Sequence, residues 1–524
     1  MKVLSTLAVL VGAVSVQVSA QSYQTASGTA DSPTADLGYV TYVGYTNATA
    51  GINYFRGIPY AQPPLGELRW QKPRAIELSN NFTGQTINAT QVAPWCWQSY
   101  PVSLASIRGA NVENQFRTQS MSEDCLILDV LVPTKPVSKS LPVLLQIHGG
   151  GYVAGSAQSY PGDGLVNASN GNIIYVSIQY RLGMFGFLAG AEVMANGVAN
   201  AGLLDQRLAL EWVQRNIRAF GGDPNRVTIW GGSAGGGSVS LQLTAGGAVD
   251  TPPFSAAIAE YPWWQPFLNR SSQEIQFRNT LRAAAQLGYN CTDLNCLRTI
   301  PTSVLWVVNQ RTQNISYPTA PQDGVGNFYF GPVVDGKFVR DLPDQEFKRG
   351  DFYKVPLMLD RDAYEGVNYS NRSITTQAEE TMDAQLLFPY ASNSFFNRLY
   401  QLYPASDYNS TFWQRVDWFS DFIVCCPTYY MATAMSDSSY FNTSSVFKLI
   451  MAAGSELHAA SQPFLTSNTT GFPAANNHTL AGILSSYWIS FTVAHDPNVM
   501  RSADAPFGRA TEAQTRRTTI HCRS

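Results

Sequence analysis

The stretch 227–240, VTIWGGSAGGGSVS, constrains the fold most, because it sets one serine, Ser233, among glycines directly after an apolar run. The preceding residues, RVTIW, are β-branched and aromatic, which is typical of a buried strand rather than a flexible loop. A sharp turn from strand to helix requires small residues two before and two after the serine, and Gly231 and Gly235 stand there. The stretch therefore predicts a strand–turn–helix unit that raises Ser233 above the edge of a parallel sheet.

Other apolar runs predict the sheet into which this strand fits. They recur at 141–148, 172–181, 226–231, 255–261, 355–360 and 444–453. Segment 202–220 has apolar residues at i, i+3, i+4 and i+7, the pattern of an amphipathic helix. Such alternation is typical of an α/β fold with a mostly parallel sheet covered on both faces. The regions 262–345 and 375–440 break the alternation, and we interpret them as helical cap insertions in a single domain, 21–524.

The N-terminus has the features of a secretory signal peptide. Residues 1–20 hold one lysine, an apolar run and Val-Ser-Ala before Gln21, which predicts cleavage after Ala20. No later apolar run reaches the roughly 18 residues that a membrane-spanning helix needs. N-glycan acceptor tripeptides are frequent, so we predict a secreted, extracellular glycoprotein. The thirteen acceptor asparagines are Asn47, Asn81, Asn88, Asn167, Asn269, Asn290, Asn314, Asn368, Asn371, Asn409, Asn442, Asn468 and Asn477.

Charge and motif content argue against several other classes of protein. The formal net charge is −3, and no block of basic residues occurs, so nucleic acid is not an expected partner. The chain contains no P-loop, dinucleotide fingerprint, zinc-ligand spacing or calcium loop. We therefore predict neither a cofactor nor a metal.

A second glycine-rich stretch, IHGGGYVAGS at 147–156, follows the first strong strand. A serine hydroxyl is a weak nucleophile and needs a base, together with donors that stabilise the oxyanion formed when it attacks. The N–H groups of Gly150 and Gly151 lack neighbouring side chains that would obstruct them. With the N–H of Ala234, which follows the serine, they are the predicted oxyanion hole.

These motifs make the chain resemble the type-B carboxylesterase and lipase family of α/β-hydrolases, which includes cholinesterases and fungal lipases. The resemblance extends from about residue 35 to 500. It implies an α/β-hydrolase fold and hydrolysis of a small-molecule or lipid ester through a serine, a histidine and an acid. The matching segments are 54–70, 122–133, 179–188, 202–217, 220–235 and 494–498.

Two positions compete for the catalytic base among the five histidines and their surroundings. Aligning the family's pattern on GSEL puts Ala453 at the base position, which would make the protein a catalytically inactive binding protein. Aligning it on HAASQPFL makes His458 the base. We prefer His458, because it leaves a loop between the strand end and the base, as the fold requires.

The acid is expected between the serine and the histidine in the chain. The segment VPLMLDRDAYEGVNY, 355–369, is a buried-type strand followed by a short acidic loop. Resemblance to the family's Glu-Gly dipeptide points to Glu365, with Asp362 as the alternative. The predicted order is Ser233, Glu365, His458.

Residues around the serine differ from the family pattern and bear on the substrate pocket. Gly232 stands where relatives commonly have glutamate, and Tyr261 where many have serine. Gly232, Trp263 and Trp264 are candidate pocket residues. The resemblance leaves two enzymes open, a carboxylesterase for soluble esters and an interfacial lipase for acylglycerols or sterol esters.

The seven cysteines fit an oxidising compartment. Resemblance to the family pairs Cys96 with Cys125 and Cys291 with Cys296. It also pairs Cys426 with Cys522, which would leave Cys425 free. The loop between Cys96 and Cys125 covers the active site or acts as a lid in relatives.

Overall fold

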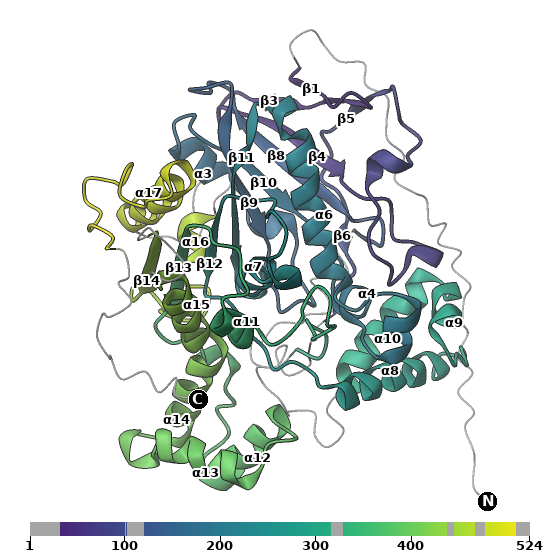
Figure 1. Cartoon of the computed structure of the whole chain (residues 1–524), viewed down its shortest axis with the longest axis vertical. Helices are drawn as coiled ribbons and strands as arrows, with labels where there is room; N and C mark the ends of the chain where they lie inside the picture. The colour runs from purple at the N-terminus through teal and green to yellow at the C-terminus, as the bar shows by residue number, and fades with distance from the viewer. Residues whose placement is uncertain are drawn as a thin grey trace, which may run out of the picture.

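A nine-stranded sheet forms the centre of the molecule, with strand order β14-β13-β12-β11-β9-β10-β8-β4-β3 (Figure 1). The computed structural model describes residues 32–99, 101, 120–315, 328–437, 445–466 and 477–509. The predicted signal peptide and most of the predicted lid loop lie outside these residues. The strands are β3 (Tyr45–Asn47), β4 (Ile52–Pro59), β8 (Ile127–Pro133), β9 (Leu141–Ile147), β10 (Ile174–Ile178), β11 (Gly222–Gly232), β12 (Ala256–Glu260), β13 (Leu357–Asp362) and β14 (Val446–Met451).

Most neighbours in this sheet are parallel, which confirms the predicted α/β fold. Strands β10, β9, β11, β12, β13 and β14 pair in parallel. Strands β8, β4 and β3 continue the sheet in antiparallel pairing. The remaining strands form two small sheets, β1 (Thr34–Asp36), β2 (Thr41–Val43) and β5 (Thr86–Asn88) in one, and β6 (Trp95–Cys96) and β7 (Met121–Ser122) in the other.

The two faces of the sheet bury different apolar clusters, as alternation along a strand requires. In β11, Val227 and Ile229 belong to the larger cluster, and Trp230 belongs to the smaller one. Helices α6 (Ala201–Asn216) and α7 (Ala234–Leu243) contact β11 on the larger cluster's side. Helices α3 (Asp163–Ala168) and α17 (His478–Ala494) pack on the opposite face, where Trp488 meets Trp230 edge-on with centroids 6.4 Å apart.

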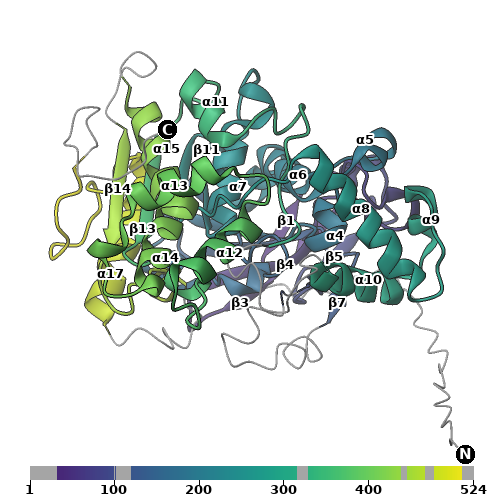
Figure 2. The same ribbon diagram turned by 90° about the horizontal axis from the view of Figure 1, so that it is seen from below.

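Helices from the two regions that interrupt the alternation gather at one end of the molecule. Figure 1 shows α8–α10 and α12–α14 in the lower half of the view, below α7. Seen from below, α12, α13 and α14 lie in front of the strands (Figure 2). The other helices are α4 (Gly183–Phe187), α5 (Ala191–Asn196), α8 (Arg270–Ala285), α9 (Leu294–Thr299), α10 (Thr302–Ile315), α11 (Pro343–Arg349), α12 (Gln377–Leu387), α13 (Asn393–Leu402), α14 (Thr411–Ser420), α15 (Cys426–Ser436) and α16 (Gln462–Leu465).

Candidate active site

Ser233 occupies a strained turn between the end of β11 and the start of α7. Its φ is 58°, in the left-handed region that residues with side chains rarely adopt. A Cβ at Gly231 would lie 2.4 Å from the carbonyl carbon of Gly235, and one at Gly235 would lie 2.1 Å from the carbonyl oxygen of Ile147. Only glycine fits at either position, so the observed turn is the one that the sequence predicts.

The structure brings His458 and Glu365 to Ser233. His458 Nε2 lies 2.9 Å from Ser233 Oγ, and His458 Nδ1 lies 2.5 Å from Glu365 Oε2. Because Nδ1 faces a carboxylate, it is the nitrogen that carries the proton, which leaves Nε2 to accept a hydrogen bond from the serine hydroxyl. His458 is 8% exposed and Glu365 is fully buried, so solvent does not compete for these contacts.

Neither alternative, Ala453 for the base or Asp362 for the acid, takes the place of His458 or Glu365 in this hydrogen-bonded chain. Ala453 follows the end of β14 and packs partly buried against the smaller apolar cluster. Asp362 is the last residue of β13, and it contacts Glu365 through its backbone N–H, which donates to Glu365 Oε1 over 2.6 Å. The geometry therefore joins Ser233 to His458 and Glu365, and not to Ala453 or Asp362.

The predicted oxyanion donors lie on the loop after β9 and at the first residue of α7. Gly150 and Gly151 have φ values of 111° and 64°, which glycine adopts without strain. Among the described residues, the N–H groups of Gly150, Gly151 and Ala234 donate no hydrogen bond to the protein. A Cβ at the neighbouring Gly149 would lie 3.1 Å from Ser233 Cβ, so this loop runs directly beside the serine.

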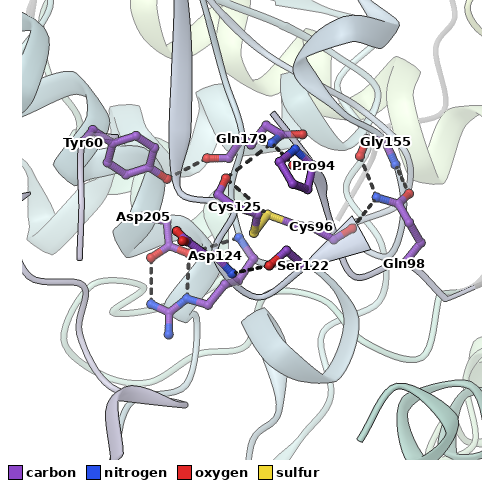
Figure 3. Close-up of a disulfide and its surroundings, with 11 residues drawn as sticks. Tyr60, Pro94, Cys96, Gln98, Ser122, Asp124, Cys125, Gly155, Gln179 and Asp205 are labelled. Carbon is purple, nitrogen blue, oxygen red and sulfur yellow. Dashed lines mark hydrogen bonds and ion pairs between the residues drawn. A yellow bond between two sulfur atoms is a disulfide. The ribbon is translucent and has the colours of Figure 1, made fainter. Parts of the chain in front are cut away.

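The Cys96–Cys125 disulfide lies beside this loop and is connected to it by Gln98 (Figure 3). Gln98 accepts from the N–H of Gly155 over 2.7 Å and donates to the carbonyl of Gly155 over 2.8 Å. The same side chain donates to the carbonyl of Cys96 over 2.8 Å. The disulfide segment therefore supports the backbone that carries the predicted oxyanion donors.

The cysteine predictions are confirmed where the structure describes both partners. Cys96 bonds to Cys125, and Cys291 bonds to Cys296. Cys425 is free and buried. Cys426 is disulfide-bonded, and its predicted partner Cys522 lies outside the described residues.

Aromatic rings surround His458. The ring centroids of Tyr261, Tyr369 and Trp263 lie 5.0, 5.2 and 5.4 Å from the imidazole centroid. Trp263 also meets Phe328 edge-on, with centroids 5.7 Å apart. The imidazole of His458 therefore lies in a buried, aromatic environment.

Trp264, in contrast, is not brought to the histidine. Its indole stacks on Phe347, with centroids 6.1 Å apart, and its Nε1 donates to Ser240 Oγ over 2.8 Å. The side chains of the two adjacent tryptophans therefore have different neighbours. Of the candidate pocket pair, only Trp263 contacts the site.

Gly232 and Tyr261, the two departures from the family pattern, turn out to be neighbours. A Cβ at Gly232 would lie 2.4 Å from the hydroxyl oxygen of Tyr261. The tyrosine therefore occupies the space that a larger residue before Ser233 would need. Each departure is visible in the sequence by itself, but the contact between them depends on β11 and β12 being adjacent.

Three carboxyl groups that the sequence analysis did not single out as a group lie behind His458. They are Glu260, Asp360 and Asp362, all fully buried. Burial raises the pKa of Glu260 to about 8, with a further contribution from Asp360. Burial likewise raises the pKa of Asp360 to about 7 and that of Asp362 to about 10. The sequence contains no signal for this cluster, because Glu260 lies in β12 and the two aspartates lie much later in the chain, in β13. Only the pairing of these strands brings the three carboxyl groups together.

The part of the chain that the structure describes contains neither a candidate metal site nor a candidate membrane-spanning helix. No group of three or more His, Cys, Asp or Glu side chains there could hold a metal ion. None of the helices described is long and apolar enough to cross a membrane.

Comparison with known proteins identifies the family. The sequence model of the carboxylesterase family matches residues 37–522. The chain belongs to the carboxylesterase family. Carboxylesterase patB of Penicillium expansum is 30% identical to it, over 91% of this chain and 90% of that protein. Lipase 2 of Geotrichum candidum is 36% identical, over 68% of this chain and 67% of that lipase.

A solved structure supports the same assignment. Aspergillus niger EstA superposes on this carboxylesterase-family chain with a TM-score of 0.77 and 30% sequence identity, over 91% of this chain and 92% of that one. The family and its relatives identify the chain as a carboxylic ester hydrolase with the α/β-hydrolase fold.

Proposed function

We propose that the chain cleaves carboxylic esters through an acyl-enzyme formed on Ser233, with His458 as general base and Glu365 as the acid that orients it. The hydrogen-bonded chain from Ser233 Oγ to His458 Nε2, and from Nδ1 to Glu365, carries this proposal. His458 takes the serine proton as Oγ attacks the ester carbonyl carbon, and Glu365 stabilises the imidazolium.

The N–H groups of Gly150, Gly151 and Ala234 hold the oxyanion of the tetrahedral intermediate. His458 then returns its proton to the leaving alcohol, and the acyl group remains on Ser233. Water enters, loses a proton to His458 and attacks the acyl carbon, which releases the carboxylic acid and restores the serine. No cofactor or metal is required for these steps.

We also propose that the mature protein is secreted and N-glycosylated. The two disulfides in the described part of the chain favour an oxidising compartment. The acceptor asparagines with described side chains are all at least partly exposed, which glycan attachment requires. They are Asn47, Asn81, Asn88, Asn167, Asn269, Asn290, Asn368, Asn371, Asn409 and Asn477.

Hydrolysis of p-nitrophenyl esters from acetate to palmitate tests the reaction, with Ser233→Ala and His458→Asn beside the wild type. We expect both variants to lose at least about 10³-fold in kcat, since the nucleophile and its base act as a unit. His495→Asn is the matched control, because His495 ends α17 in the left-handed conformation that asparagine tolerates. Its kcat should equal that of the wild type.

The same experiment separates the remaining alternatives. A wild type that hydrolyses none of the esters and takes no stoichiometric organophosphate label would contradict the proposed reaction and favour an inactive binding protein. The similarity to Geotrichum lipases makes an interfacial lipase the second candidate. Preference for long acyl chains, with a rise in rate above the solubility limit of the ester, would favour that lipase.

A further inference from the structure

The carboxyl cluster behind His458 connects the two reacting residues of the site. It consists of Glu260, Asp360, Asp362 and Glu365, at the adjacent ends of β12 and β13, where Glu260 and Asp360 are paired in register. All four are fully buried. Within the described part of the chain, their one ion pair is that of Glu365 with His458, and no lysine or arginine pairs with them.

Glu260 contacts both sides of the reaction centre. Its carbonyl oxygen accepts the backbone N–H of Ser233 over 3.1 Å. Its Oε1 accepts the hydroxyl of Ser461 over 2.7 Å, three residues after His458 in the chain. Its Oε2 accepts Nε1 of Trp230 over 2.9 Å, which fixes the orientation of the carboxyl group. One residue therefore links the nucleophile to the loop that carries the base.

Asp362 holds the same loop from the neighbouring strand. Its Oδ2 accepts the N–H of Ala460 over 3.1 Å. The loop is strained just before these contacts, since Ala459 has a φ of 70°. A residue with a side chain keeps such a conformation only where surrounding contacts impose it. Here those contacts come from the carboxyl groups on β12 and β13.

Only Glu365 among these four buried carboxyl groups has an ion-pair partner in the described residues, so the four cannot all be ionised, because the repulsion and the loss of hydration would be prohibitive. The raised pKa values of Glu260, Asp360 and Asp362 agree with protons shared within the cluster near neutral pH. Tyr160 and Tyr261, which interact electrostatically with Glu260, add no cation. Arg361, in contrast, places a positive charge near Asp360. The cluster can therefore hold the loop without placing several negative charges beside His458.

We propose that Glu260 is a positioning residue for ester hydrolysis, which sets the separation of base and nucleophile by holding Ser461 with its carboxyl group and Ser233 with its carbonyl. This inference rests on the proposed roles of Ser233 and His458. Loss of the Glu260–Ser461 hydrogen bond lets the His458 loop relax away from Ser233. Substrate binding depends on other side chains, so kcat should fall while KM stays the same.

The test compares Glu260→Ala, Glu260→Gln and Ser461→Ala on p-nitrophenyl butyrate, with active sites counted by organophosphate titration. A displacement of about 1 Å at a reacting group costs on the order of 10²-fold in rate. We therefore expect kcat to fall about 10²-fold in Glu260→Ala and about 10-fold or more in Ser461→Ala, with KM within about twofold of wild type. Glu260→Gln should stay within about threefold, since an amide can bond both Trp230 and Ser461.

Ser169→Ala is the matched control, because the buried Ser169 hydroxyl also donates a 2.7 Å hydrogen bond, to Val166 at the end of α3. It should keep the wild-type kcat. If Glu260→Ala does not fold, the kcat of Ser461→Ala still tests the positioning role of Glu260. A wild-type kcat in folded Ser461→Ala, with Ser233→Ala inactive, would overturn the positioning role alone. Wild-type activity in Ser233→Ala would instead overturn the proposed function.

Discussion

Single glycines allow the tight turn that holds Ser233 between β11 and α7. The carbonyl oxygen of Ile147 in β9 would lie 2.1 Å from a Cβ at Gly235, and backbone cannot move aside as a side chain can. The positive φ of Ser233 depends on this close approach, since neighbouring backbone imposes the turn. We therefore expect Gly235 to be as necessary to the site as the proposed nucleophile, Ser233.

We expect Gly235→Ala to lower the unfolding free energy by about 1–3 kcal/mol, as overpacking does, and to reduce kcat through displacement of Ser233. Gly482→Ala is the control. Gly482 lies inside α17 with open space around its Cα, so alanine there should stabilise the protein by about 0.5–1 kcal/mol. Urea unfolding of both variants, with kcat measured alongside, checks this. Equal stability in the two variants would contradict the steric argument.

At the scale of elements, the disulfides close loops of very different size. Cys96 and Cys125 are 29 residues apart and enclose the predicted lid, whereas Cys291 and Cys296 are 5 apart, just before and within α9. A larger loop gains more conformational freedom in the unfolded chain when its bridge is removed. Gln98, inside the larger loop, also forms hydrogen bonds with Gly155, in the loop after β9 that carries the predicted oxyanion donors.

Replacing both cysteines of each pair by serine should therefore have unequal effects. We expect a loss of about 3–4 kcal/mol without Cys96–Cys125 and about 2 kcal/mol without Cys291–Cys296. Only the first variant should also lose kcat, through the Gln98 contacts. Denaturant unfolding and ester hydrolysis of both double variants measure this, and the reverse order of stability would refute the loop-closure explanation.

At the scale of the whole molecule, the buried carboxyl cluster makes stability depend on pH. In the folded protein the pKa of Asp360 is raised to about 7 and that of Glu260 to about 8, whereas in the unfolded chain carboxyl pKa values lie near 4. Between these values the folded state binds more protons than the unfolded state. The stabilising contribution is therefore complete below about pH 4 and is lost as pH rises through the folded pKa values.

We expect the unfolding free energy to fall as the pH rises from about 5 to about 8. The fall is up to about 1.4 kcal/mol per pH unit for each proton that the folded state binds and the unfolded state does not. Asp360→Asn should flatten this fall, because it removes one proton site and lowers the pKa of Glu260. Asp504→Asn, which alters an exposed carboxylate, should leave the slope as in the wild type. Urea unfolding across this pH range measures the dependence of the unfolding free energy on pH. The same dependence in Asp360→Asn as in the wild type would contradict the raised pKa of Asp360.

Local sequence was sufficient for the sheet and for the turn at Ser233. The predicted strands at 141–148 and 226–231 are β9 and β11, and the predicted helix at 202–220 is α6 followed by a short 3₁₀ turn, Ile217–Phe220. These elements have strong local signals, since apolar periodicity and closely spaced glycines depend on neighbours in the chain. The pairing of Cys96 with Cys125 was predictable only through family resemblance.

The sequence by itself determined the α/β architecture, the turn at Ser233 and the glycine loop at Gly150 and Gly151. The sequence favoured His458 over Ala453 as the base, and the tertiary structure brings His458 to the serine. Tertiary structure alone decided that Trp264 packs elsewhere. It also decided that Tyr261 fills the space over Gly232 and that Glu260 reaches Ser461. The reason is physical: backbone turns follow from local steric limits, whereas contacts between residues up to 225 positions apart depend on the order of strands in the sheet.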